Sequence, residues 1–257
     1  MGIGCVSGNG PADAISRSSR GEGNLTPVTA TADLEHEKRL AAARSLEFVQ
    51  DGMYLGLGSG STATIMLQML GQRVRQGLRV AGIPTSEASR RLARQAGIPL
   101  LGFDQVSQLD LTIDGADEVD GNLDLIKGGG GALLREKIVA SLSRRVVIIA
   151  DSGKQVTRLG GFPLPIEVVR FAWQPVANRL RKLGAETQLR LDPDGNPTLT
   201  DEDNYILDCD FGPIDDPAEL DRTLNAMPGV MEHGLFVGLA DVLIIGQHDA
   251  SRVIERG

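Results

Sequence analysis

The chain has 257 residues, of which 41% are hydrophobic, so it is long enough for one large domain or two unequal ones. Its 34 acidic and 26 basic residues give a formal net charge of −8, which offers no broad basic surface for nucleic acid. An anionic ligand must therefore be bound by a few local cations. No apolar stretch is long enough to cross a membrane, and Cys5 and Cys209 form neither a metal-ligand nor a redox spacing. We expect a cytoplasmic protein with no membrane or nucleic-acid partner.

Residues 1–33 are rich in Gly, Ser, Thr and Ala and show no hydrophobic periodicity, which predicts a disordered N-terminal extension. The segment lacks the apolar stretch of a secretory signal. Gly2 fits the start of a myristoylation motif, but Val6 stands where that motif requires Ser or Thr. We interpret the segment as a dispensable leader or as the product of a start codon placed too early.

A glycine–serine turn follows the first predicted strand. A helix is expected from Leu34, then the strand Met53–Leu57, which runs directly into Gly58-Ser59-Gly60-Ser61-Thr62 and a helix over Ala63–Leu70. A turn between a strand and a helix points backbone N–H groups and the positive end of the helix dipole at a bound phosphate. The pattern is neither the dinucleotide GxGxxG nor a P-loop, so no nicotinamide cofactor is expected. The alternative is an ordinary helix N-cap.

Two aspartates follow a second strand. The alternating apolar residues of Leu109–Ile113 predict a strand, and Asp114-Gly115-Ala116-Asp117 ends it. Ligands of open α/β sheets lie beyond the carboxyl ends of the strands, so Asp114 and Asp117 are candidates for substrate contact. The alternative is a turn whose Asp side chains bond only local backbone N–H groups.

A lysine and a glycine-only turn come next. Lys127 precedes Gly128–Gly131, which lack side chains and let a ligand approach the backbone, at a cost of about 1 kcal/mol per residue relative to alanine. An amphipathic helix is predicted over Ala132–Leu142, with Glu136 in its first turns. That carboxylate is either a solvated acid favoured by the helix dipole or a base aimed back at the glycine turn.

The remaining pattern predicts the architecture. Strands at Val80–Ile83 and Val146–Ala150, with a helix over Ala88–Gln95 between them, extend the alternation of strands and helices that is typical of a Rossmann-like parallel sheet. Lys154 follows the second of these strands, again at a carboxyl end. A buried strand at Asp241–Gly246 is expected to return to this sheet.

After about Gly160 the pattern changes to that of a smaller α+β domain. Strands are predicted over residues 166–171, 185–191 and 205–211, and helices over 176–183 and 218–226. Turn residues at 192–197 predict a hairpin between two of the strands. We expect a Rossmann-like domain over 34–160 and 234–257 and an inserted α+β domain over 161–233.

Several segments, in order and spacing, closely resemble ribose-5-phosphate isomerase, type A. They are Gly56–Thr62, Ile113–Glu118, Lys127–Ala132 with Arg135–Lys137, Ala150–Lys154, Phe162–Val168, Asp203–Asp208 and His233–Phe236. The resemblance extends from about Leu34 to the C-terminus. It implies a ferredoxin-like inserted domain, a homodimer or dimer of dimers, and a metal-independent enzyme of the non-oxidative pentose phosphate pathway. That enzyme interconverts D-ribose 5-phosphate and D-ribulose 5-phosphate through an enediolate.

The resemblance also implies the roles of individual residues. Glu136 would shuttle the proton between neighbouring carbons, Lys127 and the amides of Gly128–Gly130 would stabilise the enediolate, and Asp114 with Asp117 would help to open the sugar ring. Lys154 and Lys38 would bind the phosphate. The substrate-binding residues expected are Ser59, Gly60, Ser61, Thr62, Asp114, Gly115, Ala116, Asp117, Lys127, Gly128, Gly129, Gly130, Lys154 and Lys38.

The scheme requires no cofactor, and His36, His233 and His248 are too scattered in the sequence to suggest a metal site. His233 stands where relatives usually have Asn. Two other readings remain: a sugar-phosphate sensor that kept the pocket and lost catalysis, and an enzyme similar to coenzyme A transferases. Such sensors usually carry a DNA-binding helix-turn-helix, which residues 1–33 cannot form, and the transferase would be labelled on a glutamate by an acyl-CoA.

Overall fold

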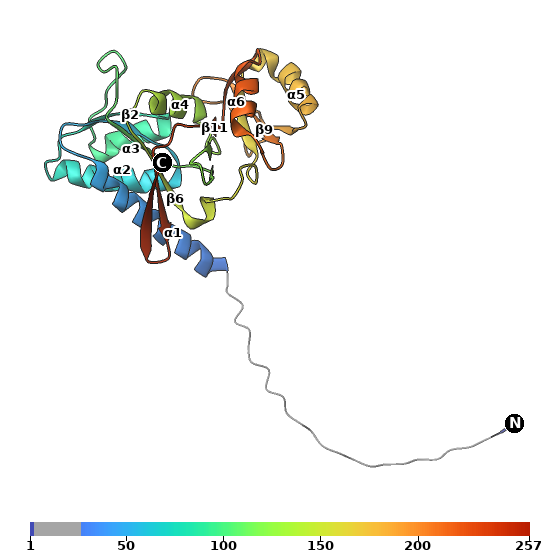
Figure 1. Cartoon of the computed structure of the whole chain (residues 1–257), viewed down its shortest axis with the longest axis horizontal. Coiled ribbons are helices and arrows are strands. Elements are labelled where there is room, and N and C mark those ends of the chain that lie inside the picture. Colours follow the sequence, from blue (N-terminus) through green and yellow to red (C-terminus); the bar gives the residue numbers. More distant parts are fainter. Residues whose placement is uncertain (3–26) are drawn as a thin grey trace.

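The fold of the chain is described by a computed structural model, which covers residues 1–2 and 27–257 and gives side-chain burial from residue 33 onward (Figure 1). The predicted N-terminal extension therefore lies mostly outside the described residues. Helix α1 (Pro27–Ser45) begins before the expected Leu34, so the last part of the segment predicted to be disordered is helical.

A six-stranded mixed sheet forms the larger part of the molecule. Its strands, in spatial order, are β13 (Ala250–Glu255), β12 (Val242–Gln247), β6 (Val146–Asp151), β3 (Leu111–Asp114), β1 (Tyr54–Leu57) and β2 (Ala81–Pro84). All neighbours pair in parallel except β12 and β13, which are antiparallel. The central strands are buried on both faces, which explains why β6 and β12 are almost continuously apolar. The predicted Rossmann-like sheet is confirmed, whereas β13 was not anticipated.

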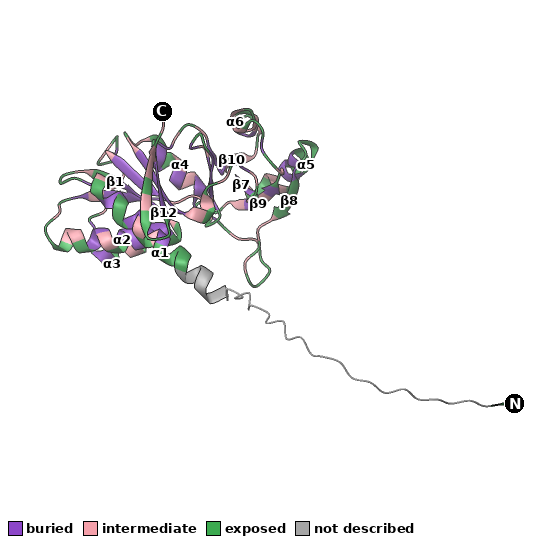
Figure 2. Ribbon diagram, turned by 60° about the horizontal axis from the view of Figure 1, so that its bottom comes forward, coloured by how far each residue is buried: buried purple, intermediate pink, exposed green. Residues whose placement is uncertain are grey.

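Helices cover both faces of this sheet. Helix α1 packs on β6, β12 and α2 (Gly60–Arg75), and α2 packs on α3 (Glu87–Ala96). Helix α4 (Leu133–Ser141) contacts β3 and lies on the opposite side (Figure 2). Alternate residues of one strand therefore enter different cores: Val147 and Ile149 pack with α1 and α2, while Ile148 and Ala150 face the other cluster.

A four-stranded antiparallel sheet forms the second part of the molecule. Its elements in chain order are β7 (Leu164–Val168), α5 (Trp173–Lys182), β8 (Glu186–Leu189), β9 (Tyr205–Asp210), α6 (Pro217–Asn225) and β10 (Val230–His233). The spatial order β10-β7-β9-β8 with this succession of elements is the ferredoxin-like arrangement. The predicted hairpin joins β8 to β9. The strand expected to reach Phe171 ends at Val168, because pairing with β9 stops there and a 3₁₀ turn, Arg170–Ala172, follows.

A small three-stranded sheet lies between the other two. It contains β11 (Leu235–Phe236), β5 (Leu125–Ile126) and β4 (Glu118–Val119), in that order. Each strand has two residues, which is too short for a hydrophobic period, so the sequence did not predict it. Strand β5 ends immediately before Lys127 and therefore fixes where that lysine enters the site. None of the helices in the described part of the chain has the length and hydropathy needed to span a membrane.

Candidate active site

The glycine–serine turn lies where β1 ends and α2 begins. A Cβ on Gly58 would lie 2.5 Å from the carbonyl oxygen of Ile113, so only glycine fits between these two strands. The Ser59 hydroxyl contacts Thr85 Oγ1 at 2.7 Å and donates to Ser86 Oγ at 2.8 Å. Ser59 is thus held by its neighbours, whereas the next residues form the open N-terminus of α2, which favours an anion.

Asp114 is buried at the carboxyl end of β3. Its Oδ1 accepts hydrogen bonds from the N–H groups of Ser59 at 2.9 Å and Gly115 at 2.8 Å, and its Oδ2 lies 3.1 Å from Lys127 Nζ. Asp114 therefore fits both interpretations made from sequence. It accepts hydrogen bonds from local backbone N–H groups, and it also pairs with Lys127, a predicted substrate-binding residue. Asp117 accepts from the N–H of Gly129 at 2.7 Å.

Lys127 is a fully buried ammonium surrounded by acceptors. Its Nζ donates to the carbonyl oxygen of Gly115 and forms ion pairs with Asp114 at 3.1 Å and Glu136 at 3.4 Å. Burial by itself lowers the pKa of Lys127, but the two carboxylates outweigh burial and raise that pKa. The lysine is therefore charged throughout the neutral range.

Glu136 projects from the first turns of α4 and is only 6% exposed, which rules out the solvated acid considered from sequence. Its Oε2 has no hydrogen-bond partner among the described residues, because the 3.4 Å approach to Lys127 Nζ is an ion pair without hydrogen-bond geometry. Burial, helped by the charge of Asp114 and opposed by Lys127, raises the pKa of Glu136 to about 8. The carboxyl group can therefore both take up and release a proton near neutral pH.

The glycine turn requires glycine for two different reasons. Gly128 has a φ of +103°, and a Cβ there would lie 2.9 Å from Leu133 and 3.1 Å from Pro165. A Cβ on Gly129 would lie 2.8 Å from the Asp117 carboxylate, in the space where the Gly129 N–H donates. The turn is thus shaped by packing and not only by its own flexibility.

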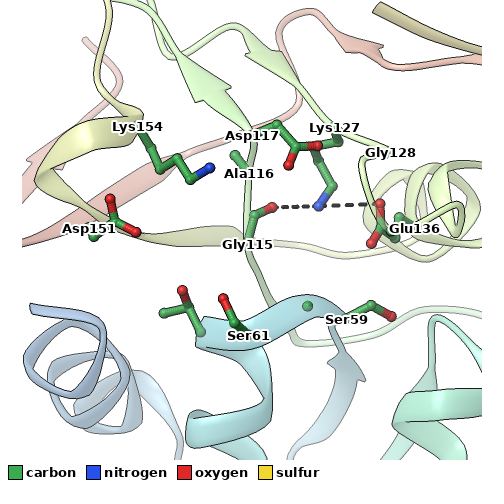
Figure 3. Close-up of a pocket in the computed structure, with 13 residues that line it drawn as sticks. Ser59, Ser61, Gly115, Ala116, Asp117, Lys127, Gly128, Glu136, Asp151 and Lys154 are labelled. Atoms are coloured by element: carbon green, nitrogen blue, oxygen red, sulfur yellow. Dashed lines mark hydrogen bonds and ion pairs between the residues drawn. The ribbon is translucent and has the colours of Figure 1, made fainter. Parts of the chain in front are cut away.

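These elements surround a single pocket (Figure 3). It is lined by Ser59, Gly60, Ser61, Thr62, Gly115, Ala116, Asp117, Lys127, Gly128, Gly130, Glu136, Asp151 and Lys154. The close-up shows Lys127 between Gly115 and Glu136, with Lys154 at the opposite end beside Asp151 and above the turn that carries Ser61. The pocket thus has a carboxylate–lysine end and a lysine–hydroxyl end.

Most of the residues predicted from sequence meet here, with three exceptions. Asp114 does not line the pocket and instead pairs with Lys127, which does. Gly129 does not line the pocket either, and its N–H donates to the lining residue Asp117. Lys38 does not line the pocket either, because α1 presents Glu37 toward this region, where its carboxylate accepts from the N–H and hydroxyl of Ser152 at 2.9 and 2.7 Å. A role for Lys38 in binding phosphate stays a prediction.

Asp151 lines the pocket and was not singled out from sequence. It ends β6, is buried, and accepts a hydrogen bond from the N–H of Gly153 at 3.1 Å. The rule that ligands lie beyond the carboxyl ends of parallel strands, which located Asp114 and Lys154, would also have found it.

Known proteins that are similar to this chain in sequence belong to one family. The sequence model of ribose 5-phosphate isomerase A (phosphoriboisomerase A) matches residues 81–250. The ribose-5-phosphate isomerase A of Nitrobacter hamburgensis is 53% identical over 229 residues, which cover 87% of this chain and 99% of the relative. That of Gloeobacter violaceus is 53% identical over 224 residues, covering 86% of this chain and 97% of the relative.

Solved structures agree with the sequence relatives. A D-ribose-5-phosphate isomerase in complex with phospho-erythronic acid superposes with a TM-score of 0.85 at 39% identity, covering 87% of this chain and 99% of the other. The ribose 5-phosphate isomerase A of Methanocaldococcus jannaschii gives 0.82 at 40% identity, covering 85% and 97%. The chain belongs to the ribose 5-phosphate isomerase A family.

Proposed function

We propose that this protein is an isomerase that interconverts D-ribose 5-phosphate and D-ribulose 5-phosphate through an enediolate. The observation that carries the proposal is the buried Glu136 carboxyl group at one end of the pocket. Its Oε2 has no hydrogen-bond partner in the described part of the chain and lies 3.4 Å from the Lys127 ammonium. Such a pair offers a base for a weakly acidic C–H and a positive charge for the oxyanion that results.

The substrate phosphate would bind at the other end of the pocket. Ser61 and Thr62 lie in the first turn of α2, where backbone N–H groups and the helix dipole favour an anion, and Lys154 adds a positive charge. Because the chain as a whole carries a net charge of −8, binding of a phosphate depends on these local groups. With the phosphate at this end, the carbonyl end of an open-chain pentose extends toward Glu136.

Glu136 would remove the proton from C2 of the aldose and return it to C1. With a pKa of about 8, the carboxylate form is a stronger base than an ordinary glutamate, and the protonated form is still accessible for the return step. General acid–base catalysis of this kind contributes about 10²- to 10⁴-fold in rate. Lys127 and the N–H groups of Gly128 and Gly130, all residues that line the pocket, would stabilise the two oxygens of the enediolate.

Ring opening needs a further acid or base. We assign this step to Asp117, which lines the pocket, with Asp114 acting through its ion pair with Lys127. No step of the scheme requires a cofactor or metal ion. The proposal is supported by the solved relative that binds phospho-erythronic acid, since the planar carboxylate of a phosphorylated sugar acid has a charge distribution similar to that of an enediolate.

Several finer properties belong to the same proposal. We place the enzyme in the cytoplasm and in the non-oxidative pentose phosphate pathway, as a homodimer or dimer of dimers with a Rossmann-like catalytic domain and an inserted α+β domain. The family resemblance supports these assignments. The acidic net charge of −8 supports the absence of a nucleic-acid partner.

The direct test is an NMR assay of the purified protein with ribose 5-phosphate in D₂O containing EDTA. We expect ribulose 5-phosphate to form with deuterium entering from the solvent, which reports metal-independent isomerisation by proton transfer. Binding of the sugar phosphate without any ketose would overturn the proposal and favour a sugar-phosphate sensor.

A further inference from the structure

An arginine from the four-stranded sheet contacts the glycine turn of the site. Arg190 follows β8, and its Nη1 donates to the carbonyl oxygens of Gly128 at 2.9 Å and Gly129 at 3.1 Å. The other side of the guanidinium is held by Asp208 on β9, which accepts from Nε at 2.9 Å and from Nη2. The Arg190 side chain is only 16% exposed and that of Asp208 27% exposed, so the pair is largely shielded from water.

The two carbonyl groups that Arg190 holds belong to peptide units whose N–H groups point away from Arg190. In a planar trans peptide the N–H points away from the preceding C=O. The Gly128 carbonyl shares its peptide with the N–H of Gly129, which donates to Asp117 at 2.7 Å. The Gly129 carbonyl shares its peptide with the N–H of Gly130, a pocket-lining residue whose N–H has no acceptor in the part of the chain that the structure describes. Fixing the oxygens therefore fixes the direction of both N–H groups.

We propose that Arg190, oriented by Asp208, is a positioning residue for catalysis: it holds the glycine turn so that the Gly130 N–H points at the enediolate and Asp117 stays in place. The proposal rests on the isomerase function proposed above. A run of glycines has no side chains to limit its backbone, so an external group must select one conformation. The guanidinium also polarises the peptides it contacts, which makes their N–H groups stronger donors.

The geometry explains why this position requires arginine. The planar guanidinium donates to Asp208 from one edge and to two carbonyl oxygens from another nitrogen at the same time. A lysine has one compact ammonium and cannot span both sets of acceptors with the same directions. Arg190→Lys should therefore keep the charge and lose part of the positioning.

Steady-state kinetics of ribose 5-phosphate isomerisation test the proposal with three variants: Arg190→Gln, Arg190→Lys and Asp208→Asn. We expect kcat to fall about 10- to 100-fold in Arg190→Gln, because a displacement of about 1 Å in a catalytic group costs up to about 10²-fold. The KM should change less than about threefold, since the phosphate end of the pocket is untouched. Arg190→Lys and Asp208→Asn should have intermediate kcat values.

Arg256 provides a matched control. It also donates to two backbone carbonyls, those of Ala240 at 2.7 Å and Leu123 at 2.9 Å, and pairs with Asp124 at 3.5 Å, but it does not line the pocket. Arg256→Gln should lower the melting temperature about as much as Arg190→Gln while leaving kcat within about twofold of wild type. This control separates loss of positioning from a general loss of stability.

A second readout follows the transition state directly. Binding of phospho-erythronic acid, measured by calorimetry, should weaken in each Arg190 and Asp208 variant by about the same factor as kcat/KM, while binding of inorganic phosphate stays within about twofold. If Arg190→Gln does not fold, Arg190→Lys and Asp208→Asn carry the same test. Wild-type kcat in these variants, or a loss equal to that of Arg256→Gln, would overturn the inference. An inactive wild-type protein would instead overturn the proposed function.

Discussion

Two lysines, Lys127 fully buried and Lys137 partly buried, lie against the same aromatic ring. The ammonium of Lys127 lies 5.5 Å from the centroid of the Phe236 ring, and that of Lys137 lies 4.9 Å from it. Both distances suit a cation–π contact, and both lysines have carboxylate partners. Of these two lysines, only Lys127 lines the pocket. We expect the Lys127 group, which contains Asp114 and Glu136, to be reactive, and the Lys137 group, which contains Glu232, to be structural.

The ammonium of Lys137 has two hydrogen-bond acceptors close to it. Its Nζ donates to Glu232 at 2.6 Å and to the carbonyl oxygen of His233 at 2.7 Å. Burial lowers the pKa of Lys137, and Glu232 opposes that effect. The Lys127 group, in contrast, holds two carboxylates around one ammonium, and among the described residues Oε2 of Glu136 has no hydrogen-bond partner. Burial and charge are common to both groups, whereas only the group around Lys127 lines the pocket.

The largest predicted difference between the two groups is the effect of removing one carboxylate. Glu136→Gln keeps the shape of the side chain and removes the base, so we expect kcat to fall about 10²- to 10⁴-fold while binding of ribose 5-phosphate changes little. Glu232→Gln, in the structural group, should leave kcat within about threefold. Kinetics combined with calorimetric binding measures both quantities. Equal losses of kcat in the two variants would show that the distinction between the groups is wrong.

Replacing each lysine gives a smaller and more informative contrast. Lys127→Met should lower kcat about 10²- to 10³-fold, the loss typical of removing one group that stabilises an oxyanion. Lys137→Met should leave kcat within about threefold and lower the free energy of unfolding by about 2 to 4 kcal/mol, because Glu232 keeps its charge in a largely buried position without its partner. Urea denaturation and steady-state kinetics on both proteins check the pair. A large loss of kcat in Lys137→Met would mean that its role is not structural.

Sequence reasoning predicted residues that meet at one pocket where each lies just after a strand or in the first turns of a helix. Asp114, Asp117 and Lys154 follow strands of the parallel sheet, and Glu136 lies in the first turns of a helix, so the order of elements was enough to bring them together. The burial of Glu136 could not be predicted, because its position on the flank of the helix fits either exposure.

The contacts that could not be predicted from the sequence depend on pairing between segments that are distant along the chain. Arg190 meets the glycine turn only because β8 pairs with β9, and β9 with β7. The two-residue strands of the small sheet, which deliver Lys127 and Phe236 to the same place, carry no periodic pattern. Such contacts follow from strand order and register, and a single sequence does not encode these in any local motif.

The smallest predicted effect is on the pH dependence of stability and concerns His233. The carbonyl oxygen of His233 accepts a hydrogen bond from Lys137 of the structural group. The His233 side chain is fully buried, Nδ1 accepts from the N–H of Leu235 at 3.3 Å, and Nε2 faces Asp221 at 3.4 Å and Glu232 at 3.9 Å. Burial, reinforced by the positive charge of Lys137, lowers the pKa of His233 to about 3. The histidine is therefore neutral in the folded protein at neutral pH.

This lowered pKa makes the stability depend on pH. Below its usual pKa of about 6.5, the unfolded chain binds a proton at His233 that the folded chain does not bind, so stability falls as the pH drops from about 6.5 toward 3. His233→Asn removes the titrating group, and between pH 6.5 and 4.5 the variant should lose about 2 kcal/mol less unfolding free energy than wild type. Urea denaturation at several pH values measures the difference, with the exposed His36→Asn as a control that should follow wild type. If the free energy of unfolding changed with pH equally in wild type and His233→Asn, the imidazole would have to gain a proton in the folded state. Water or a closer carboxylate would then have to reach His233.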